Sequence, residues 1–203
     1  MKHSFFLLCF LFSFRMGHTQ EMRLENMRAP NMNVFLKMMD SMMVQMEMIS
    51  DSTSVETNFM RQMIPHHEGA VAMADYEIKF GKNFEIIQLA KSIRVEQENE
   101  IRLMQIWLNR RCAVKHPYAL PGGYRISMKK SMEQMMSDMP ADAQLSNIDQ
   151  AFSRVMMPHH QAAVDMARAV LRYSADQKTN LFAQHIISSQ EVEIEQMAVA
   201  IKQ

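Results

Sequence analysis

The sequence has little of what sheet proteins and nucleic-acid-binding proteins require. Its 203 residues include only five glycines and six prolines, which are few for a sheet protein with many turns. Lysine plus arginine and aspartate plus glutamate both number 22, so the formal net charge is zero. Without a positive field to attract phosphates, nucleic acid is not an expected partner. These scarcities favour a helical protein that does not bind nucleic acid.

Cysteine is also scarce, and one of the two cysteines lies in an apolar N-terminal run. Residues 4–14 form this run, which is too short to span a bilayer and is typical of a secretory signal. We expect residues 1–20 to be a signal peptide and the mature chain to be periplasmic or secreted, in a bacterial cell envelope, without stable membrane insertion. An uncleaved membrane anchor is the alternative. Cleavage removes Cys9 and leaves Cys112 unpaired, so packing must stabilise the fold.

Methionine, by contrast, is abundant: the chain contains 24 methionines. Several of them lie in a segment that occurs twice in the sequence. Residues 63–74 read MIPHHEGAVAMA and residues 156–167 read MMPHHQAAVDMA. The offset between them is 93 positions, and the same offset aligns residues upstream and downstream without a gap. Such a register indicates that one helical unit is present twice.

The repeat divides the chain into two units of three helices each. We assign residues 21–110 to the first unit, residues 111–124 to a linker and residues 125–203 to the second unit. The expected helices are a methionine-rich one, one with the histidine pair and a charged one, at residues 31–49, 55–80 and 83–109 and again at 125–138, 147–173 and 176–202. No segment shows sustained period-two alternation, so we predict no sheet. Pro65 and Pro158 are expected to bend helices that continue through them.

Both units contain a His-His pair with one methionine three positions before it and another seven positions after its first histidine. Neutral imidazole and thioether together suit Cu(I), Ag(I) or copper in general. Metal affinity through these histidines should weaken as the pH falls through about 6.5. The alternative is that the histidines are hydrogen-bonded structural residues. The candidate ligands are Met63, His66, His67, Met73, Met156, His159, His160 and Met166.

The methionine-rich helices offer a second set of candidate ligands. Methionines at helical spacing more often fill a core, because this side chain packs into irregular gaps. However, thioethers also remain useful for soft metals where thiolates would be oxidised. Both readings stay open for Met39, Met42, Met43 and Met46 and for Met132, Met135, Met136 and Met139.

The third helices place polar residues on their apolar faces. Gln97, Glu100, Gln190 and Glu193 are repeated in both units, and buried polar groups need partners. We expect them to orient the imidazoles, with direct metal ligation as the alternative. His185 aligns with a serine and is expected to be unrelated to the shared site. We interpret Cys112 as a surface thiol, with a copper role as the alternative.

The stretch MIPHHEGAVAMA followed by LAKSIRVEQENEIRLMQIWL resembles the domain-of-unknown-function 305 family. The resemblance runs from Phe59 to Leu108, with a weaker copy from Phe152 to Met197. It implies a ferritin-like helical bundle, export, and association with copper or silver. The second copy departs from the family motif, because Gln161 stands at the position of Glu68. The resemblance therefore says less about the role of the second unit than about the first.

We therefore expect an all-α fold: a ferritin-like four-helix bundle formed by two repeated helix pairs, with two methionine-rich helices beside it. The expected function is sequestration or transport of copper, with Cu(I) favoured, Cu(II) possible and Ag(I) as a surrogate, and no enzymatic activity. One alternative is a methionine-rich structural or partner-binding protein. The other is a ferritin-like di-metal oxidoreductase, against which the absence of a Glu-x-x-His motif counts.

Overall fold

A computed structural model describes residues 33–50, 54–111 and 119–202. The expected signal peptide and Cys112 lie outside the described residues. Within these ranges the regular structure is helical and no strand occurs. The helices are α2 (Val34–Glu47), α3 (Val55–Phe80), α4 (Phe84–Arg111), α5 (Gly122–Ser137), α6 (Ile148–Tyr173) and α7 (Gln177–Ala200), with a short 3-10 helix η1 (Asp142–Gln144). The all-α prediction is confirmed.

Polar side chains set the starts of most of these helices. Asn33, Ser54, Asn147 and Asp176 are the N-caps of α2, α3, α6 and α7, and each side chain accepts a hydrogen bond from a backbone N–H in the first turn. The helix that carries each histidine pair begins and ends within one residue of its predicted bounds. α5 begins at Gly122, inside the stretch that we assigned to the linker.

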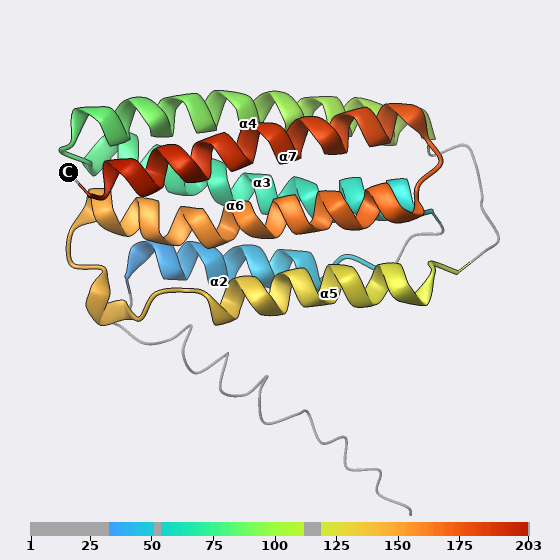
Figure 1. Cartoon of the computed structure of the whole chain (residues 1–203), viewed down its shortest axis with the longest axis horizontal. Helices are drawn as coiled ribbons and strands as arrows, with labels where there is room; N and C mark the ends of the chain where they lie inside the picture. The colour runs from blue at the N-terminus through green and yellow to red at the C-terminus, as the bar shows by residue number, and fades with distance from the viewer. Residues whose placement is uncertain (1–32, 51–53, 112–118, 203) are drawn as a thin grey trace, which may run out of the picture. The chain divides into compact units, whose positions relative to one another are not determined.

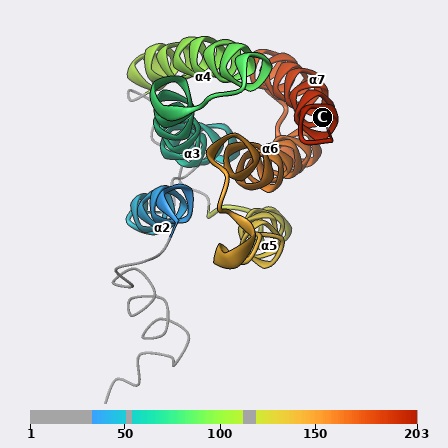
Figure 2. The same cartoon turned by 90° about the vertical axis from the view of Figure 1, so that its left-hand side faces the viewer.

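The four long helices form the bundle. α3 packs along α4, α6 packs along α7, and contacts between α3 and α6 and between α4 and α7 complete the ring, which is seen end-on in Figure 2. The helices of each pair run antiparallel (Figure 1), as the short loops between them require. The two repeated helix pairs therefore build one bundle, as predicted.

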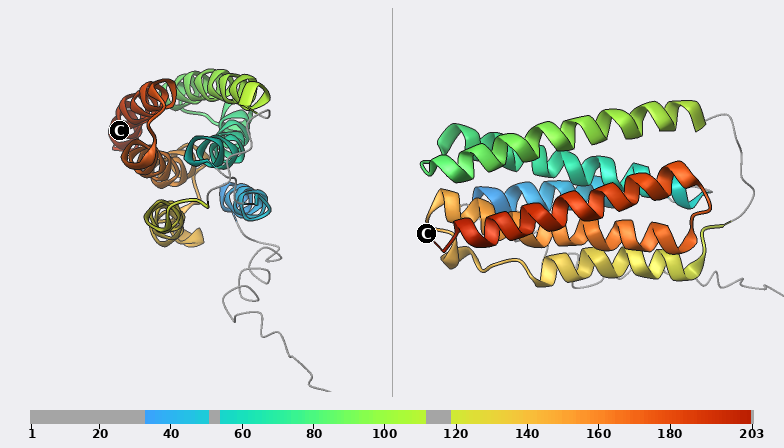
Figure 3. Two further views of the ribbon diagram at one scale, coloured as in Figure 1. Left: turned by 90° about the vertical axis from the view of Figure 1, so that its right-hand side faces the viewer. Right: turned by 45° about the horizontal axis from the view of Figure 1, so that its top comes forward.

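The methionine-rich helices lie outside this ring. α2 packs on α3 and α5 packs on α6, on the side away from α4 and α7 (Figure 3). Asn33, which caps α2, also donates through its side-chain amide to the carbonyl of Leu145 at 2.9 Å, so the start of α2 is tied to the segment after α5. One continuous core of buried side chains includes residues of all six α-helices. None of the described helices is long and apolar enough to cross a membrane.

Candidate metal centre in the bundle core

The two histidine pairs meet where α3 and α6 face each other. The rings of His66 and His159 lie 3.8 Å apart between centroids, and both side chains are buried. Pro65 and Pro158 precede the pairs, and both helices continue through them, as predicted. The repeat therefore brings four imidazoles, two from each unit, together in the middle of the bundle.

Hydrogen bonds fix the proton positions on two of these rings. His159 Nε2 lies 3.0 Å from the backbone carbonyl of His66, and a carbonyl only accepts, so Nε2 carries the hydrogen. His67 Nε2 lies 2.7 Å from Glu100 Oε2, and with an ionised carboxylate it is again the donor. Nδ1 of both rings has no hydrogen-bond partner and is the nitrogen that could bind a metal.

The second unit repeats the His–Glu contact. His160 Nε2 lies 2.9 Å from Glu193 Oε2, which is the counterpart of the contact between His67 and Glu100. Because a carboxylate that holds one ring nitrogen orients the imidazole, the expectation that the two glutamates orient the histidines agrees with this geometry. Direct ligation of a metal by the glutamates remains the alternative to this orienting role.

Many polar atoms in this core have no hydrogen-bond partner. Most buried polar atoms in proteins do have one, so a cluster of exceptions requires an explanation, such as an ion or water bound between them. Around the two histidine pairs, the atoms without a hydrogen-bond partner are both ring nitrogens of His66 and of His160, Nδ1 of His67 and of His159, both side-chain amide atoms of Gln97 and Gln190, Oε1 of Glu100 and both carboxylate oxygens of Glu193. His160 Nε2 is close to Glu193, but the pair does not have hydrogen-bond geometry.

Burial keeps two of the histidines neutral. The pKa of His66 is lowered well below its usual value by burial and then by the neighbouring His159, His67 and His160. The pKa of His159 is lowered by burial and by His160 and His67, against a smaller opposite effect of its hydrogen bond to His66. We therefore expect these two rings to take up a proton only at lower pH than an ordinary histidine, because burial disfavours the charged form of an imidazole.

Thioethers share the core with the imidazoles. The four methionines of the repeated motif, Met63, Met73, Met156 and Met166, are all fully buried. On α2 the stripe of Met39, Met42, Met43 and Met46 is also buried and belongs to the same core. Of the second methionine set, Met135 on α5 is buried, whereas Met132 and Met136 on α5 and Met139 just after its end are half-buried. The structure therefore brings the motif methionines and the α2 stripe into the core more completely than the α5 stripe.

A glycine controls how closely α2 approaches the histidine helix. A Cβ on Gly69 would lie 3.0 Å from the sulfur of Met42 and 3.2 Å from its Cβ. The corresponding position on α6 is Ala162. Because α2 sits so close to α3 there, Met42 reaches the backbone one turn after His66.

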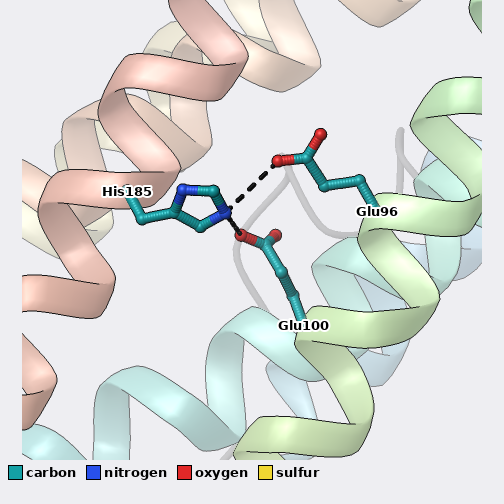
Figure 4. Close-up of side chains that lie close together, drawn as sticks. All are labelled: Glu96, Glu100 and His185. Carbon is teal, nitrogen blue, oxygen red and sulfur yellow. Dashed lines mark ion pairs between the residues drawn. The ribbon is translucent and has the colours of Figure 1, made fainter.

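His185 is closer to the shared site than its sequence context indicated. Its Nε2 lies 3.3 Å from Glu96 Oε1 and 3.6 Å from Glu100 Oε1 (Figure 4). His185 thus contacts the outward-facing oxygen of Glu100, whose other oxygen contacts His67. The pKa of Glu96 is raised by burial and by the carboxylates of Glu193 and Glu100, with Ser189 and His185 acting in the opposite direction. The repeat did not indicate this cluster, because the counterparts of Glu96 and His185 in the other unit are serines.

The donor set suits a soft metal ion. Neutral imidazoles with free lone pairs and fully buried thioethers are the ligands that Cu(I) and Ag(I) prefer. A thioether has no proton to lose, and the two histidines with lowered pKa are already deprotonated, so binding releases few protons. Several ring nitrogens of the four histidines have no hydrogen-bond partner in the protein, so they are available to bind an ion.

Several solved structures are similar to this chain. Three solved structures of CopM, in Ag-bound, Cu(II)-bound and Cu(I)-bound forms, are 28%, 29% and 28% identical to this chain, with TM-scores of 0.55, 0.56 and 0.55. Each covers 72% of this chain and 94%, 95% and 95% of its own chain. A fragment from Deinococcus radiodurans that contains the domain of unknown function DUF305 shares the fold, with a TM-score of 0.54, 23% identity, and coverage of 75% of this chain and 99% of its own.

No curated protein matches the sequence. The family described as "Domain of unknown function (DUF305)" matches residues 14–108, which contain the first histidine pair, and the overlapping residues 56–201, which contain both pairs. The resemblance noted from the repeated motif is confirmed. The chain belongs to the DUF305 family.

Proposed function

We propose that this protein binds copper, with Cu(I) preferred, through histidine and methionine side chains in the core of its bundle. The observation that supports this most directly is the set of buried ring nitrogens without hydrogen-bond partners, all in a core that also buries the motif methionines. Soft sulfur and neutral nitrogen donors favour Cu(I) and Ag(I) over Zn(II), which is seldom held by thioethers. Ag(I) is then a redox-inert surrogate for Cu(I).

The proposed role is to sequester or carry copper in the bacterial cell envelope, as a periplasmic or secreted protein. CopM, which shares the fold over most of both chains, has been solved with Ag, Cu(I) and Cu(II) bound. A site buried in a helical core holds an ion away from solvent, which suits storage or transfer. The apolar N-terminal run supports export.

We propose binding rather than catalysis. A ferritin-like di-metal oxidoreductase would place Glu-x-x-His motifs inward, and no glutamate in the sequence is followed by histidine three positions later. Oxygen consumption by the purified protein with Fe(II) tests this choice directly, and turnover would contradict it. The methionine-rich α2 offers little surface to a protein partner, because its stripe is buried against α3.

The experiment that tests the proposal is an anaerobic titration with Cu(I), and separately with Ag(I), against a competing chelator. Met63→Leu and Met60→Leu form a matched pair: both methionines lie on α3 and are fully buried, but only Met63 belongs to the repeated motif. Leucine keeps the volume and removes the sulfur, so each change should have little effect on stability. We expect Met63→Leu to weaken Ag(I) and Cu(I) binding at least tenfold and Met60→Leu to leave it unchanged.

The histidines are tested with the double variant His66→Ala/His67→Ala. If they bind the metal, affinity falls, whereas purely structural histidines would lower the melting temperature without changing affinity. The apoprotein melting temperature of each variant separates the two effects. Unchanged Cu(I) and Ag(I) affinity in both the histidine variant and Met63→Leu contradicts the proposal.

A further inference from the structure

A group of nitrogen and oxygen donors without sulfur lies between α4 and α7, beside the bundle core. It consists of Glu96 and Glu100 on α4 and His185 on α7, drawn in Figure 4. One donor atom of each residue lies within 4.8 Å of the donor atoms of the other two. His185 Nε2 lies 3.3 Å from Glu96 Oε1 and 3.6 Å from Glu100 Oε1.

These separations agree with the spacing of ligands around a small cation. Zn(II) binds nitrogen and oxygen at about 2.0–2.1 Å in tetrahedral geometry, which places neighbouring ligand atoms about 3.3–3.4 Å apart. The two measured distances lie at or slightly above that value. Three protein ligands would also leave a fourth position open for water.

Glu100 gives a second, independent indication. Its side chain is only 5% exposed, and its Oε1, which faces His185, has no hydrogen-bond partner. Its other oxygen contacts His67. A buried carboxylate oxygen without a partner is unfavourable unless a proton, water or cation is bound to it. His185, by contrast, is 56% exposed, so an ion can reach the group from solvent.

We propose that Glu96, Glu100 and His185 form a site for a borderline divalent cation, Zn(II) or Cu(II), separate from the thioether-containing core. A donor set of one imidazole and two carboxylates suits these ions and not Cu(I) or Ag(I). By the Irving–Williams order Cu(II) binds it more tightly than Zn(II). The site occurs once, because the equivalent positions in the other half of the repeat hold Ser92 and Ser189.

Zn(II) titration of the full chain, first loaded with Ag(I) to fill sulfur-containing sites, tests the site. We expect His185→Ala and Glu96→Gln each to lose one bound Zn(II) or to weaken its binding at least tenfold. Ser92→Ala removes the equivalent side chain of the other unit and should bind Zn(II) as the original chain does. Both changed residues of the site lie outside the core histidine pairs, so Ag(I) binding should stay unchanged in all three variants.

With Cu(II) as the probe, electron paramagnetic resonance reports which protein atoms coordinate the ion, including the imidazole nitrogen of His185. The signal of the Ag(I)-loaded protein should show coupling to one imidazole nitrogen, and His185→Ala should abolish it. The proposal is overturned if His185→Ala and Glu96→Gln bind Zn(II) with unchanged number and affinity, or if Ser92→Ala weakens binding equally. Zn(II) binding is measured independently of Cu(I) binding. A negative result for the Glu96–Glu100–His185 site therefore does not contradict the proposed Cu(I) site in the core, and the reverse also holds.

Discussion

Glu77 is a carboxyl group buried at the end of α3, away from the metal centre. Burial, and then the adjacent Asp149, raise the pKa of Glu77 to about 8. The pKa of Asp149 is shifted down: its own burial would raise it, but the backbone N–H groups of Asn83 and Lys82 donate to it at 2.7 and 2.8 Å and outweigh that effect. Of the two carboxyl groups, Glu77 is therefore the one that keeps its proton to higher pH.

This proton makes stability depend on pH. Between the unfolded pKa of Glu77, 4.5, and its folded pKa of about 8, the folded state holds a proton that the unfolded state releases. The contribution of Glu77 is therefore complete below pH 4.5 and is lost as the pH rises to about 8. We expect Glu77→Gln, which keeps a donor at this position, to remove a slope of up to about 1.4 kcal/mol per pH unit. Urea denaturation at pH 5, 6, 7 and 8 measures the slope.

Glu68→Gln is the matched control, because Glu68 lies on the same helix and is exposed. This variant should keep the pH slope of the original chain. If Glu77→Gln and the original chain show parallel profiles from pH 5 to 8, Glu77 does not hold the proton.

At the scale of elements, the contact of α2 with α3 depends on one missing side chain. A Cβ on Gly69 would lie 3.0–3.2 Å from three atoms of Met42, including the Cβ next to its backbone. Because one of these atoms is the Cβ next to the backbone, relief of the contact requires a shift of a few tenths of an ångström in the backbone of α2 as well as in the methionine side chain. The stripe of α2 that lies on the core therefore depends on Gly69.

We expect Gly69→Ala to destabilise the protein by about 1 kcal/mol, because crowding of about 1–3 kcal/mol outweighs the gain in helix propensity of about 1 kcal/mol. In the Met42→Ala background the crowding is reduced, so there Gly69→Ala should be neutral or stabilising. Chemical denaturation of the four chains of this double-mutant cycle gives the coupling energy. Additive effects would show that α2 does not approach α3 as closely as described.

The helices could be predicted from sequence because two independent signals agreed on them: apolar spacing and a repeat without gaps. The repeat also predicted that the two histidine pairs lie in equivalent environments, as the contacts of His67 with Glu100 and His160 with Glu193 show. The register between α4 and α7 could not be predicted, because helical periodicity fixes a face and not the axial position of one helix along another. For this reason the contact of His185 with Glu96 was missed.

At the scale of the whole molecule, the bundle keeps unsatisfied polar atoms at its centre, from the imidazoles to the amides of Gln97 and Gln190. Each buried polar atom without a partner costs about 1–3 kcal/mol, so the metal-free bundle is less stable than its packing alone would make it. An ion that binds the folded form and satisfies these atoms should stabilise the whole fold.

We expect Ag(I) to raise the melting temperature, since a ligand at 100 times its dissociation constant stabilises a protein by about 2.7 kcal/mol. The shift should be reduced in His66→Ala, which removes a ring with two unpartnered nitrogens, and retained in His185→Ala, which lies outside the core pairs. Differential scanning calorimetry with and without Ag(I) measures it. A shift of equal size in His66→Ala and the original chain would indicate that the histidine pair does not bind the ion.

The hydrogen bond from His159 to the backbone of His66 joins the two copies of the repeat at the point where they meet. In a dimer of identical chains every substitution at such a junction appears twice. Joining both copies in one polypeptide removes that restriction, because each position can then mutate by itself. Ser92 and His185 have already diverged in this way while the facing histidine pairs have not. A covalently joined pair can thus keep its shared centre and acquire a different chemistry on only one side.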